Sequence, residues 1–274
     1  MSDTILQANH LVKTYSQSAG RFGLGSSQIK ALDDVSIALK AGSTLAVVGE
    51  SGSGKSTLAR CLLQLHPFDS GEVLFEGQDL AKLDKKALRA MRKHLQMVFQ
   101  DPFASLNPRM KVGEIVSEGL LIHGLGNKAE QIAQMLVMLK RVGLTEADAQ
   151  KYPHQFSGGQ RQRIGIARAL VLKPRVLVCD EPVSALDVSV QAQILLLLKE
   201  LQAEMHLSTI FISHDLRVVR HLADDIVVMN KGKVVEQGSI ESIYNAPQQA
   251  YTQQLLSAIP GRKAATIIRT LETA

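Results

Sequence analysis

Apolar and polar residues alternate along the first forty positions of the chain. From Ile5 to Tyr15, and again from Ile29 to Leu39, about every second residue is apolar. This period predicts two half-buried antiparallel strands. The segment between them, Ser16 to Gln28, is rich in Ser and Gly and is expected to be an exposed loop.

The next part of the chain combines short strands with a long helical region. Leu45 to Val48 and Glu72 to Glu76 are predicted strands, and a helix is expected from about Lys55 to Leu65. From about residue 82 to residue 172 the apolar period is helical, and a loop flanked by two prolines is expected to interrupt it at Phe103 to Arg109. The positions that carry this period are Leu88, Met91, Arg92 and Leu95, and Ile132, Met135, Leu136 and Leu139.

Strands and helices alternate in the last third of the chain, which implies parallel strands joined by right-handed crossovers. A tight turn at Lys231 to Lys233 then leads into a hairpin strand, Val234 to Gln237. The expected strands are Val176 to Cys179, Thr209 to Ile212 and Ile226 to Met229, and the expected helices are Val190 to Glu204 and Leu216 to Ala223.

Composition narrows the class of protein. Of the 274 residues, 45% are hydrophobic and 21% are charged, which is enough to bury a core. No apolar run approaches the roughly 20 residues of a membrane-spanning helix, and the first ten residues do not resemble a secretory signal. Cys61 and Cys179 lie far apart in apolar surroundings. We therefore expect a soluble cytosolic protein from a reducing compartment.

The charge balance does not indicate a nucleic-acid-binding protein. The net charge is +5, from 31 basic and 26 acidic residues, which is mild for this length. The basic run from Lys85 to Lys93 contains no aromatic residue, and a solvated helix face is the favoured interpretation. No nucleic-acid partner is expected.

A glycine-rich loop that binds phosphate is predicted between the strand ending at Val48 and the helix from Lys55. Its sequence fits G-x-x-x-x-G-K-[ST], where glycines let backbone N–H groups approach phosphate oxygens. Lys55 would reach the β- and γ-phosphates of a nucleotide, and the Ser56 hydroxyl would ligate Mg²⁺. The alternative is a glycine-rich turn of no function. The predicted binding residues are Gly49, Glu50, Ser51, Gly52, Ser53, Gly54, Lys55, Ser56 and Thr57.

An acidic pair follows the apolar strand that begins at Val176. A buried strand that delivers Asp180 beside the phosphate loop could hold Mg²⁺, and Glu181 could then orient or deprotonate an attacking water. Without the phosphate loop, a strand followed by an acidic turn would explain the pair equally well.

A second anion-binding device is predicted at Ser157, Gly158, Gly159 and Gln160, just before the helix from Arg161 to Leu172. The glycines would expose N–H groups, and Ser157 could cap the helix. The arrangement is useful if two chains meet head to tail and each supplies this device to the nucleotide of the other. A plain N-capped helix is the alternative.

These motifs, in this order, resemble the ATP-binding cassette (ABC) ATPases. The similarity extends from about Leu6 to Pro260. It implies an α/β fold of the P-loop NTPase type, with a RecA-like core around a mixed, mainly parallel sheet, an antiparallel β subdomain and an α-helical subdomain. We expect one ABC domain over residues 1–260 and a short tail over 241–274. Within the domain we expect a β-rich part at about 1–80, a helical subdomain at about 82–172, and a catalytic core at about 42–66 and 173–240.

The resemblance implies further roles. Tyr15 would stack on adenine, and Gln100 would contact Mg²⁺ and the attacking water, alongside Ser56 and Asp180 as metal ligands. His214 would contact the γ-phosphate, and the segment from Ser184 to Asp187 would communicate across a dimer. From the residues alone, Tyr15 could equally be a strand aromatic, Gln100 a surface amide and His214 a core histidine. Phe156 replaces the leucine that is common before the SGGQ sequence.

Three segments resemble the oligopeptide, dipeptide and nickel importer branch, and the match is close to the second ATPase of peptide importers. They are Gln100 to Arg109, Glu181 to Gln193, and Asn245 to Pro260. The branch implies ATP and Mg²⁺ as cofactors, a second ATPase subunit, two membrane permeases that dock near Gln100 to Glu114, and a substrate-binding protein. The site of action would be the cytoplasmic face of a bacterial inner membrane. No cysteine follows Cys179, so no iron–sulfur cluster is expected.

Other functions fit less well. Nickel or metal chelates and cationic antimicrobial peptides are alternative cargoes for the same motor. ABC proteins of DNA repair or translation carry paired cassettes, coiled-coil insertions or zinc cysteines, which this sequence lacks. A GTPase would need N-K-x-D, but Lys233 stands where the aspartate should be in the string from Asn230. A small-molecule kinase would leave the SGGQ sequence unexplained.

Overall fold

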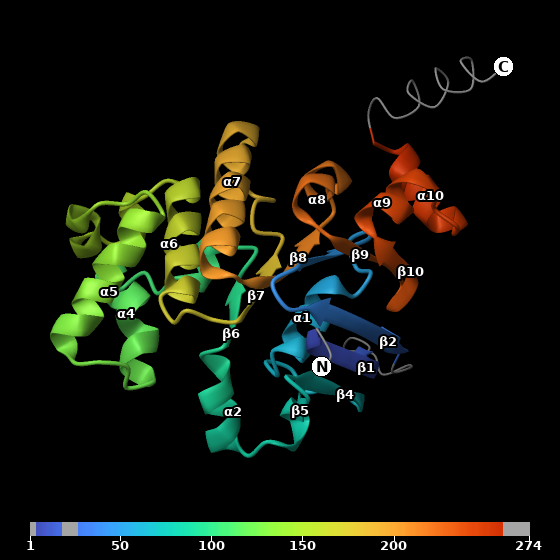
Figure 1. Cartoon of the computed structure of the whole chain (residues 1–274), viewed down its shortest axis with the longest axis horizontal. Coiled ribbons are helices and arrows are strands. Elements are labelled where there is room, and N and C mark those ends of the chain that lie inside the picture. Colours follow the sequence, from blue (N-terminus) through green and yellow to red (C-terminus); the bar gives the residue numbers. More distant parts are fainter. Residues whose placement is uncertain (1–3, 18–26, 260–274) are drawn as a thin grey trace, which may run out of the picture.

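The computed structural model describes residues 4–17 and 27–259, and these ranges form two sheets with helices packed around them (Figure 1). The first sheet is antiparallel, with the strand order β2-β1-β4-β5. Opposed pairs such as Leu6 and Leu39 put apolar residues from β1 and β2 on one face. The strands are β1 (Thr4–Gln17), β2 (Ser27–Lys40), β4 (Ser70–Phe75) and β5 (Gln78–Asp79).

The predicted antiparallel pair is confirmed, and both strands are longer than the sequence pattern indicated. Ser16 and Gln17 belong to β1 and pair with Gln28 and Ser27 of β2, although all four were expected in the loop. The rest of the predicted loop, residues 18–26, lies outside the described residues.

The second sheet has six strands in the order β10-β9-β3-β8-β7-β6, parallel except for β10. Every residue of β3, β7 and β8 is buried, as expected for parallel strands covered on both faces. The predicted parallel α/β core is therefore confirmed. The strands are β3 (Thr44–Val48), β6 (Leu95–Val98), β7 (Val176–Asp180), β8 (Ser208–Ser213), β9 (Asp225–Asn230) and β10 (Lys233–Ser239).

The prediction that Leu95 continues a helix was wrong. Helix α2 (Lys85–Arg92) ends before it, and Leu95 opens β6 at the edge of the six-stranded sheet. The carbonyl of His94 accepts hydrogen bonds from the N–H groups of Arg175 and Val176, both at 3.0 Å. These hydrogen bonds align the segment beside β7. The prediction failed because pairing with a strand distant in the sequence outweighs a short helical period.

The predicted loop at Phe103 to Arg109 also contains a helical turn, α3 (Pro102–Ser105). The Asp101 carboxylate accepts hydrogen bonds from the N–H groups of Phe103 and Ala104, and Pro102 occupies the first helical position. This is a favourable start for a helix, and it explains why a segment with two prolines is not wholly irregular.

The remaining helices surround the six-stranded sheet. In Figure 1, α4, α5 and α6 gather at one end of the molecule, whereas α9 and α10 lie at the other end beside β10. The helix α1 ends three residues earlier than predicted. The bounds are α1 (Lys55–Leu62), α4 (Val112–Ile122), α5 (Lys128–Arg141), α6 (Gly158–Leu170), α7 (Val188–Met205), α8 (Leu216–Leu222), α9 (Ile240–Asn245) and α10 (Ala250–Ser257), with short 3-10 turns at Leu80–Lys82, Glu146–Gln150 and Pro153–Gln155.

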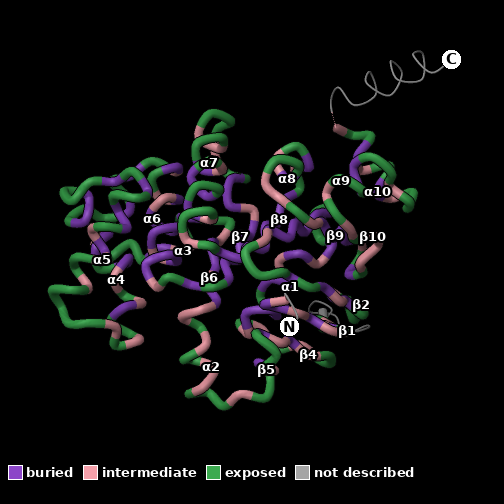
Figure 2. The backbone as a smooth tube through the Cα atoms, viewed as in Figure 1, coloured by how far each residue is buried: buried purple, intermediate pink, exposed green. Residues whose placement is uncertain are grey.

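The six-stranded sheet separates two hydrophobic cores. Leu45 and Val47 of β3 pack with the antiparallel sheet and α1, whereas Ala46 and Val48 pack with the helices of the other face. Alternate side chains of a strand point to opposite faces, so this central sheet joins the layers. Figure 2 shows the buried segments concentrated along these strands and the helices that cover them. Within residues 4–17 and 27–259, no helix has both the length and the apolar character needed to cross a bilayer.

We predict that the stability of the helical end of the molecule depends on Leu139 of α5, which is completely buried in the core between this helix and its neighbours. Leu139→Ala should lower the free energy of unfolding by about 2–5 kcal/mol, because it removes buried contacts and leaves a cavity. Val137→Ala on the same helix is the matched control, since that side chain is 55% exposed. It should change stability by less than about 0.5 kcal/mol. Equal losses in urea denaturation of the two variants would contradict this account of the core.

Candidate active site

The predicted phosphate loop connects β3 to α1, and two of its glycines are sterically required. Gly49 has φ +148°, and a Cβ atom there would lie 2.1 Å from the carbonyl oxygen of Met229. Gly54 has φ +105°, and a Cβ atom would lie 2.3 Å from the carbonyl oxygen of Ala31. Neighbouring backbone therefore encloses the loop on both sides, and only glycine fits at these two positions.

The amino end of α1 is left open toward the loop. Gly54 occupies the N-cap position, where no side chain accepts a hydrogen bond, and the first turn has no acidic residue. The unpaired N–H groups and the helix dipole there favour an anion. The Ser53 hydroxyl is buried and has no hydrogen-bond partner in the structure. A phosphate group fits this combination of unused donors.

Lys55 is buried within its own loop, with a side chain that folds back on the backbone. It is only 4% exposed, and its ammonium donates to the carbonyl oxygens of Gly49 and Glu50, both at 2.9 Å. Burial lowers the pKa of Lys55, and the nearby carboxylates of Glu181 and Asp180 oppose that shift. The loop therefore already holds a positive charge at the point where phosphates would bind.

Asp180 ends β7 directly beside α1. The Ser56 hydroxyl donates to its carboxylate over 3.0 Å, and Asp180 is 3% exposed. Burial raises the pKa of Asp180, while the Ser56 hydrogen bond and the nearby Arg60 lower it. A hydroxyl and a carboxylate with oxygen atoms this close form a suitable donor set for Mg²⁺, which prefers oxygen ligands.

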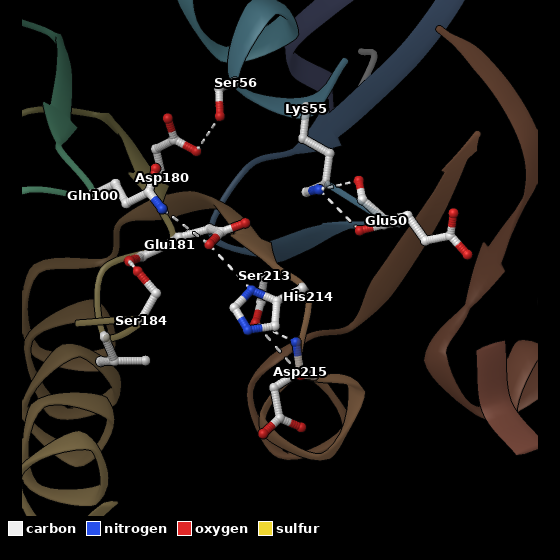
Figure 3. A network of polar contacts seen from close by, with 12 residues as sticks. Glu50, Lys55, Ser56, Gln100, Asp180, Glu181, Ser184, Ser213, His214 and Asp215 are labelled. Atoms are coloured by element: carbon white, nitrogen blue, oxygen red, sulfur yellow. Dashed lines mark hydrogen bonds and ion pairs between the residues drawn. The ribbon is translucent and has the colours of Figure 1, made fainter. Parts of the chain in front are cut away.

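Glu181 lies at the centre of a polar network that three loops build (Figure 3). Its carboxylate accepts a hydrogen bond from the Gln100 amide at 3.3 Å and lies 3.1 Å from Nδ1 of His214. Gln100 follows β6, Glu181 follows β7 and His214 follows β8. The three side chains meet because the carboxyl ends of parallel strands share one edge of the sheet.

The backbone of Glu181 adopts an uncommon conformation, with φ +44°. Its N–H donates to the carbonyl of Ile212 at 3.1 Å, and its own carbonyl accepts from the Ser184 hydroxyl at 3.1 Å. A positive φ is costly for a residue with a side chain and persists only where surrounding contacts enforce it. Here those contacts direct the carboxylate toward Gln100 and His214.

A cavity of about 780 Å³ lies over the phosphate loop and this network. It is large enough for a nucleotide. Predicted residues in its lining are Ser51, Gly52, Gly54, Lys55, Ser56, Thr57, Gln100, Glu181 and His214. The residues that sequence reasoning missed are Ile29, Lys30 and Ala31 of β2 and Lys231 of the β9–β10 turn. No local signal could have identified these four, because only the tertiary fold brings β2 and that turn to the loop.

Tyr15 lies next to this cavity rather than in its described lining. It pairs across the antiparallel sheet with Ile29, which does line the cavity. Its hydroxyl lies 3.2 Å from Nδ1 of His66, and the Lys13 ammonium lies 5.5 Å from the centre of its ring. The side chain is 37% exposed, so it could receive a stacking ligand from the side of the cavity.

The four residues Ser157, Gly158, Gly159 and Gln160 are at a different place, the amino end of α6, and are absent from the described lining of the cavity. The Ser157 hydroxyl accepts the N–H of Gln160 at 3.3 Å, and the Gln160 side chain accepts the N–H of Ser157 at 3.0 Å. This reciprocal cap matches the predicted N-cap. A Cβ atom at Gly159 would lie 2.4 Å from Val190 of α7, so the glycine permits close packing of the two helices.

Comparison with known proteins gives consistent matches. A family model described as "ABC transporter" matches residues 32–184. The dipeptide transport ATP-binding protein DppF of Escherichia coli K12 is 51% identical over 95% of this chain and 78% of its own length. The oligopeptide transport ATP-binding protein AppF of Bacillus subtilis 168 is 49% identical over 94% of this chain and 79% of its own length.

The solved structures that resemble this chain include ATP-binding cassettes. One is the cassette MJ0796 in a dimeric post-hydrolysis state with bound ADP and Pi. It is 31% identical, with a TM-score of 0.75, and the match covers 86% of this chain and 98% of that one.

Proposed function

The chain belongs to the ABC transporter family, and we propose that it is the motor subunit that drives uptake of dipeptides or oligopeptides through separate permeases. The family resemblance seen in the sequence is confirmed, as is the expectation of an ATPase. The observation that carries the proposal is the meeting of Lys55, Ser56, Glu181 and His214 around one cavity at the amino end of α1. The cargo class is carried over from the transport proteins named above.

ATP would bind with its phosphates over the loop from Gly49 to Thr57. The unpaired N–H groups at the start of α1 would face the phosphate oxygens, and Lys55 would exchange its Glu50 carbonyl partner for the β- and γ-phosphates while the Gly49 carbonyl keeps holding it. Ser56, Asp180 and Gln100 would hold Mg²⁺. When bound, the ion neutralises phosphate charge and orients the terminal phosphoryl group.

Glu181 is the proposed general base for water. Its carboxylate is fixed by the positive φ and by the contact with Gln100, so it can accept a proton from a water in line with the terminal phosphate. His214, 3.1 Å from the same carboxylate, would hold that carboxylate and contact the γ-phosphate. Tyr15 would stack on the adenine from its position beside Ile29.

A complete site would need two chains. Ser157, Gly158, Gly159 and Gln160 form a capped helix end away from their own phosphate loop, which supports a head-to-tail dimer in which each supplies this end to the partner's ATP. The similar cassette MJ0796 is dimeric in its post-hydrolysis state, which supports a dimer here. The partner would be a second copy or a related ATPase subunit.

The permeases would dock on the surface from Gln100 to Glu114, at the inner face of the membrane. Phe103 in this segment is 62% exposed, and the Arg161 guanidinium lies 3.8 Å from the centre of its ring. An exposed aromatic supported by a cation is a common anchor in protein interfaces. Because Gln100 belongs both to this surface and to the Glu181 network, permease movement could reach the site directly.

We predict that Glu181→Gln retains ATP binding but loses hydrolysis. The amide keeps the shape of the side chain and cannot take a proton, so kcat should fall by roughly 10²–10⁴-fold. Phosphate release measures turnover, and fluorescent ATP binding measures affinity. The matched control is Glu241→Gln, an exposed carboxylate at the start of α9, which should hydrolyse ATP normally. Near-normal turnover in Glu181→Gln would exclude Glu181 as the base.

We predict that Ser157→Arg inactivates the site whose phosphate loop belongs to the partner chain, because the large cation would block the end of α6. Vanadate trapping of a photoreactive nucleotide in the dimer identifies which chain's phosphate loop still turns over. Labelling should persist on the variant chain and disappear from its partner. Ala133→Arg, at an exposed position of α5, adds the same charge and should leave both labelled. Loss of label from the variant chain itself would contradict the head-to-tail dimer.

We predict that cells lacking this chain lose uptake of labelled dipeptides and tripeptides. The wild-type gene should restore uptake and Glu181→Gln should not, because transport requires hydrolysis. Uptake of ⁶³Ni²⁺ and of a cationic antimicrobial peptide is measured in the same strains. If uptake of nickel or of the cationic peptide depends on the chain and uptake of the labelled dipeptides and tripeptides does not, the peptide-import proposal is wrong. The ATPase assignment would still stand.

A further inference from the structure

The C-terminal helices of the described chain reach the phosphate loop. The hydroxyl of Tyr251, in the first turn of α10, accepts a hydrogen bond from the backbone N–H of Glu50 at 3.3 Å. Glu50 is the second residue of the loop, about two hundred positions earlier in the sequence. The proposed hydrolysis chemistry makes no use of this contact.

The hydrogen bond from Glu50 to Tyr251 and the one from Lys55 to Gly49 lie at opposite ends of the same peptide group. The carbonyl of Gly49 and the N–H of Glu50 belong to the same peptide unit, and that carbonyl accepts the Lys55 ammonium at 2.9 Å. Hydrogen bonds at the two ends of one peptide polarise each other, and together they fix the orientation of its plane. Tyr251 therefore acts on the carbonyl that holds Lys55, without touching the lysine itself.

Contacts with the sheet and the core hold the helix that carries Tyr251 in place. Just before α10, the Glu236 carboxylate of β10 accepts the N–H groups of Gln248 and Gln249, at 2.7 and 3.1 Å. Leu256, near the end of the helix, is 2% exposed and packs in the core. The buried Tyr244 of α9 donates its hydroxyl to the carbonyl of Leu216 at the start of α8. These contacts fix α9 and α10 to the sheet that carries the phosphate loop.

The same end of the fold contacts the loop again through the β9–β10 turn. The N–H of Gly232 donates to the carbonyl of Ser53 at 3.0 Å, and the carbonyl of Met229 closes the space beside Gly49. Tyr251 completes this support at Glu50. Burial raises the pKa of Tyr251, so its hydroxyl stays a neutral acceptor at physiological pH.

We propose that Tyr251 is a positioning residue for ATP: its hydroxyl fixes the Gly49–Glu50 peptide and thereby sets the phosphate loop in its binding shape before the nucleotide arrives. The inference rests on the proposed nucleotide site and is independent of the cargo. A loop that is already ordered loses less conformational entropy on binding, so the effect falls on ATP affinity rather than on the chemical step.

The test is Tyr251→Phe in the full chain, which removes one oxygen atom and keeps the ring. Loss of a single neutral hydrogen bond should raise the Kd of a fluorescent ATP analogue, and the KM for ATP, by roughly 2- to 10-fold. The value of kcat should stay within about twofold of wild type, because no group at the reacting phosphate changes. Gln254→Ala, at an exposed position of the same helix, is the matched control and should leave Kd unchanged.

Two further variants separate the possible results. Tyr251→Leu removes ring and hydroxyl together; if it weakens ATP binding while Tyr251→Phe equals wild type, ring packing is responsible and the positioning role is excluded. A fall in kcat with unchanged KM in Tyr251→Phe would also overturn the proposal. Lys55→Ala tests the nucleotide site itself: undiminished ATP binding in that variant would count against the proposed site, whatever Tyr251→Phe does.

Discussion

The arrangement of the candidate active site depends on a lysine charge buried at the edge of the central sheet. Lys55 is almost inaccessible to solvent, and its ammonium donates to two carbonyls of its own loop. A buried charge is tolerated when hydrogen bonds and opposite charges surround it. The loop must therefore curl around the side chain, which accounts for the positive φ at Gly49 and Gly54 and for the carbonyls of Met229 and Ala31 that enclose these residues.

The acidic side of the site follows from the same constraint. Asp180 ends β7 next to the loop and Glu181 follows it, and both favour the charged form of Lys55. Asp180 in turn is stabilised by the Ser56 hydroxyl, whereas Glu181 contacts Gln100 and His214. Lys55, Asp180 and Glu181 each have a hydrogen-bond partner within the chain, whereas the Ser53 hydroxyl and the amino end of α1 stay open for a phosphate. Nucleotide binding then exchanges these partners for phosphate oxygens and metal, without exposing an unpaired charge at any stage.

How much the sequence could predict depended on whether the deciding contacts were local. The strands β3, β7 and β8 were predictable because each is a short apolar run followed at once by a loop with recognisable chemistry. Convergence of Glu181 and His214 followed from the rule that parallel strands end at one edge, whereas Gln100 was assigned to the site only by the family resemblance, because the strand before it was not predicted. The strand β6 was missed because no glycine or proline separates it from α2, and its partner β7 lies some eighty residues later. The contacts of Lys231 and Tyr251 with the site could not be predicted either, since each joins segments remote in the sequence.

The division of the molecule into layers explains why one chain holds only half of the proposed site. The phosphate loop is fixed by β3, β9 and the C-terminal helices, whereas the amino end of α6 packs on α7 through Gly159, among the helices at the other end of the sheet. The reciprocal cap of Ser157 and Gln160 satisfies donors of that helix end within the chain. The end of α6 therefore has its partners within the chain, whereas the phosphate loop keeps open donors for a nucleotide. Association of two chains would then be driven by ATP bound between them. In that case ATP would control dimer formation and would also be the substrate that is hydrolysed.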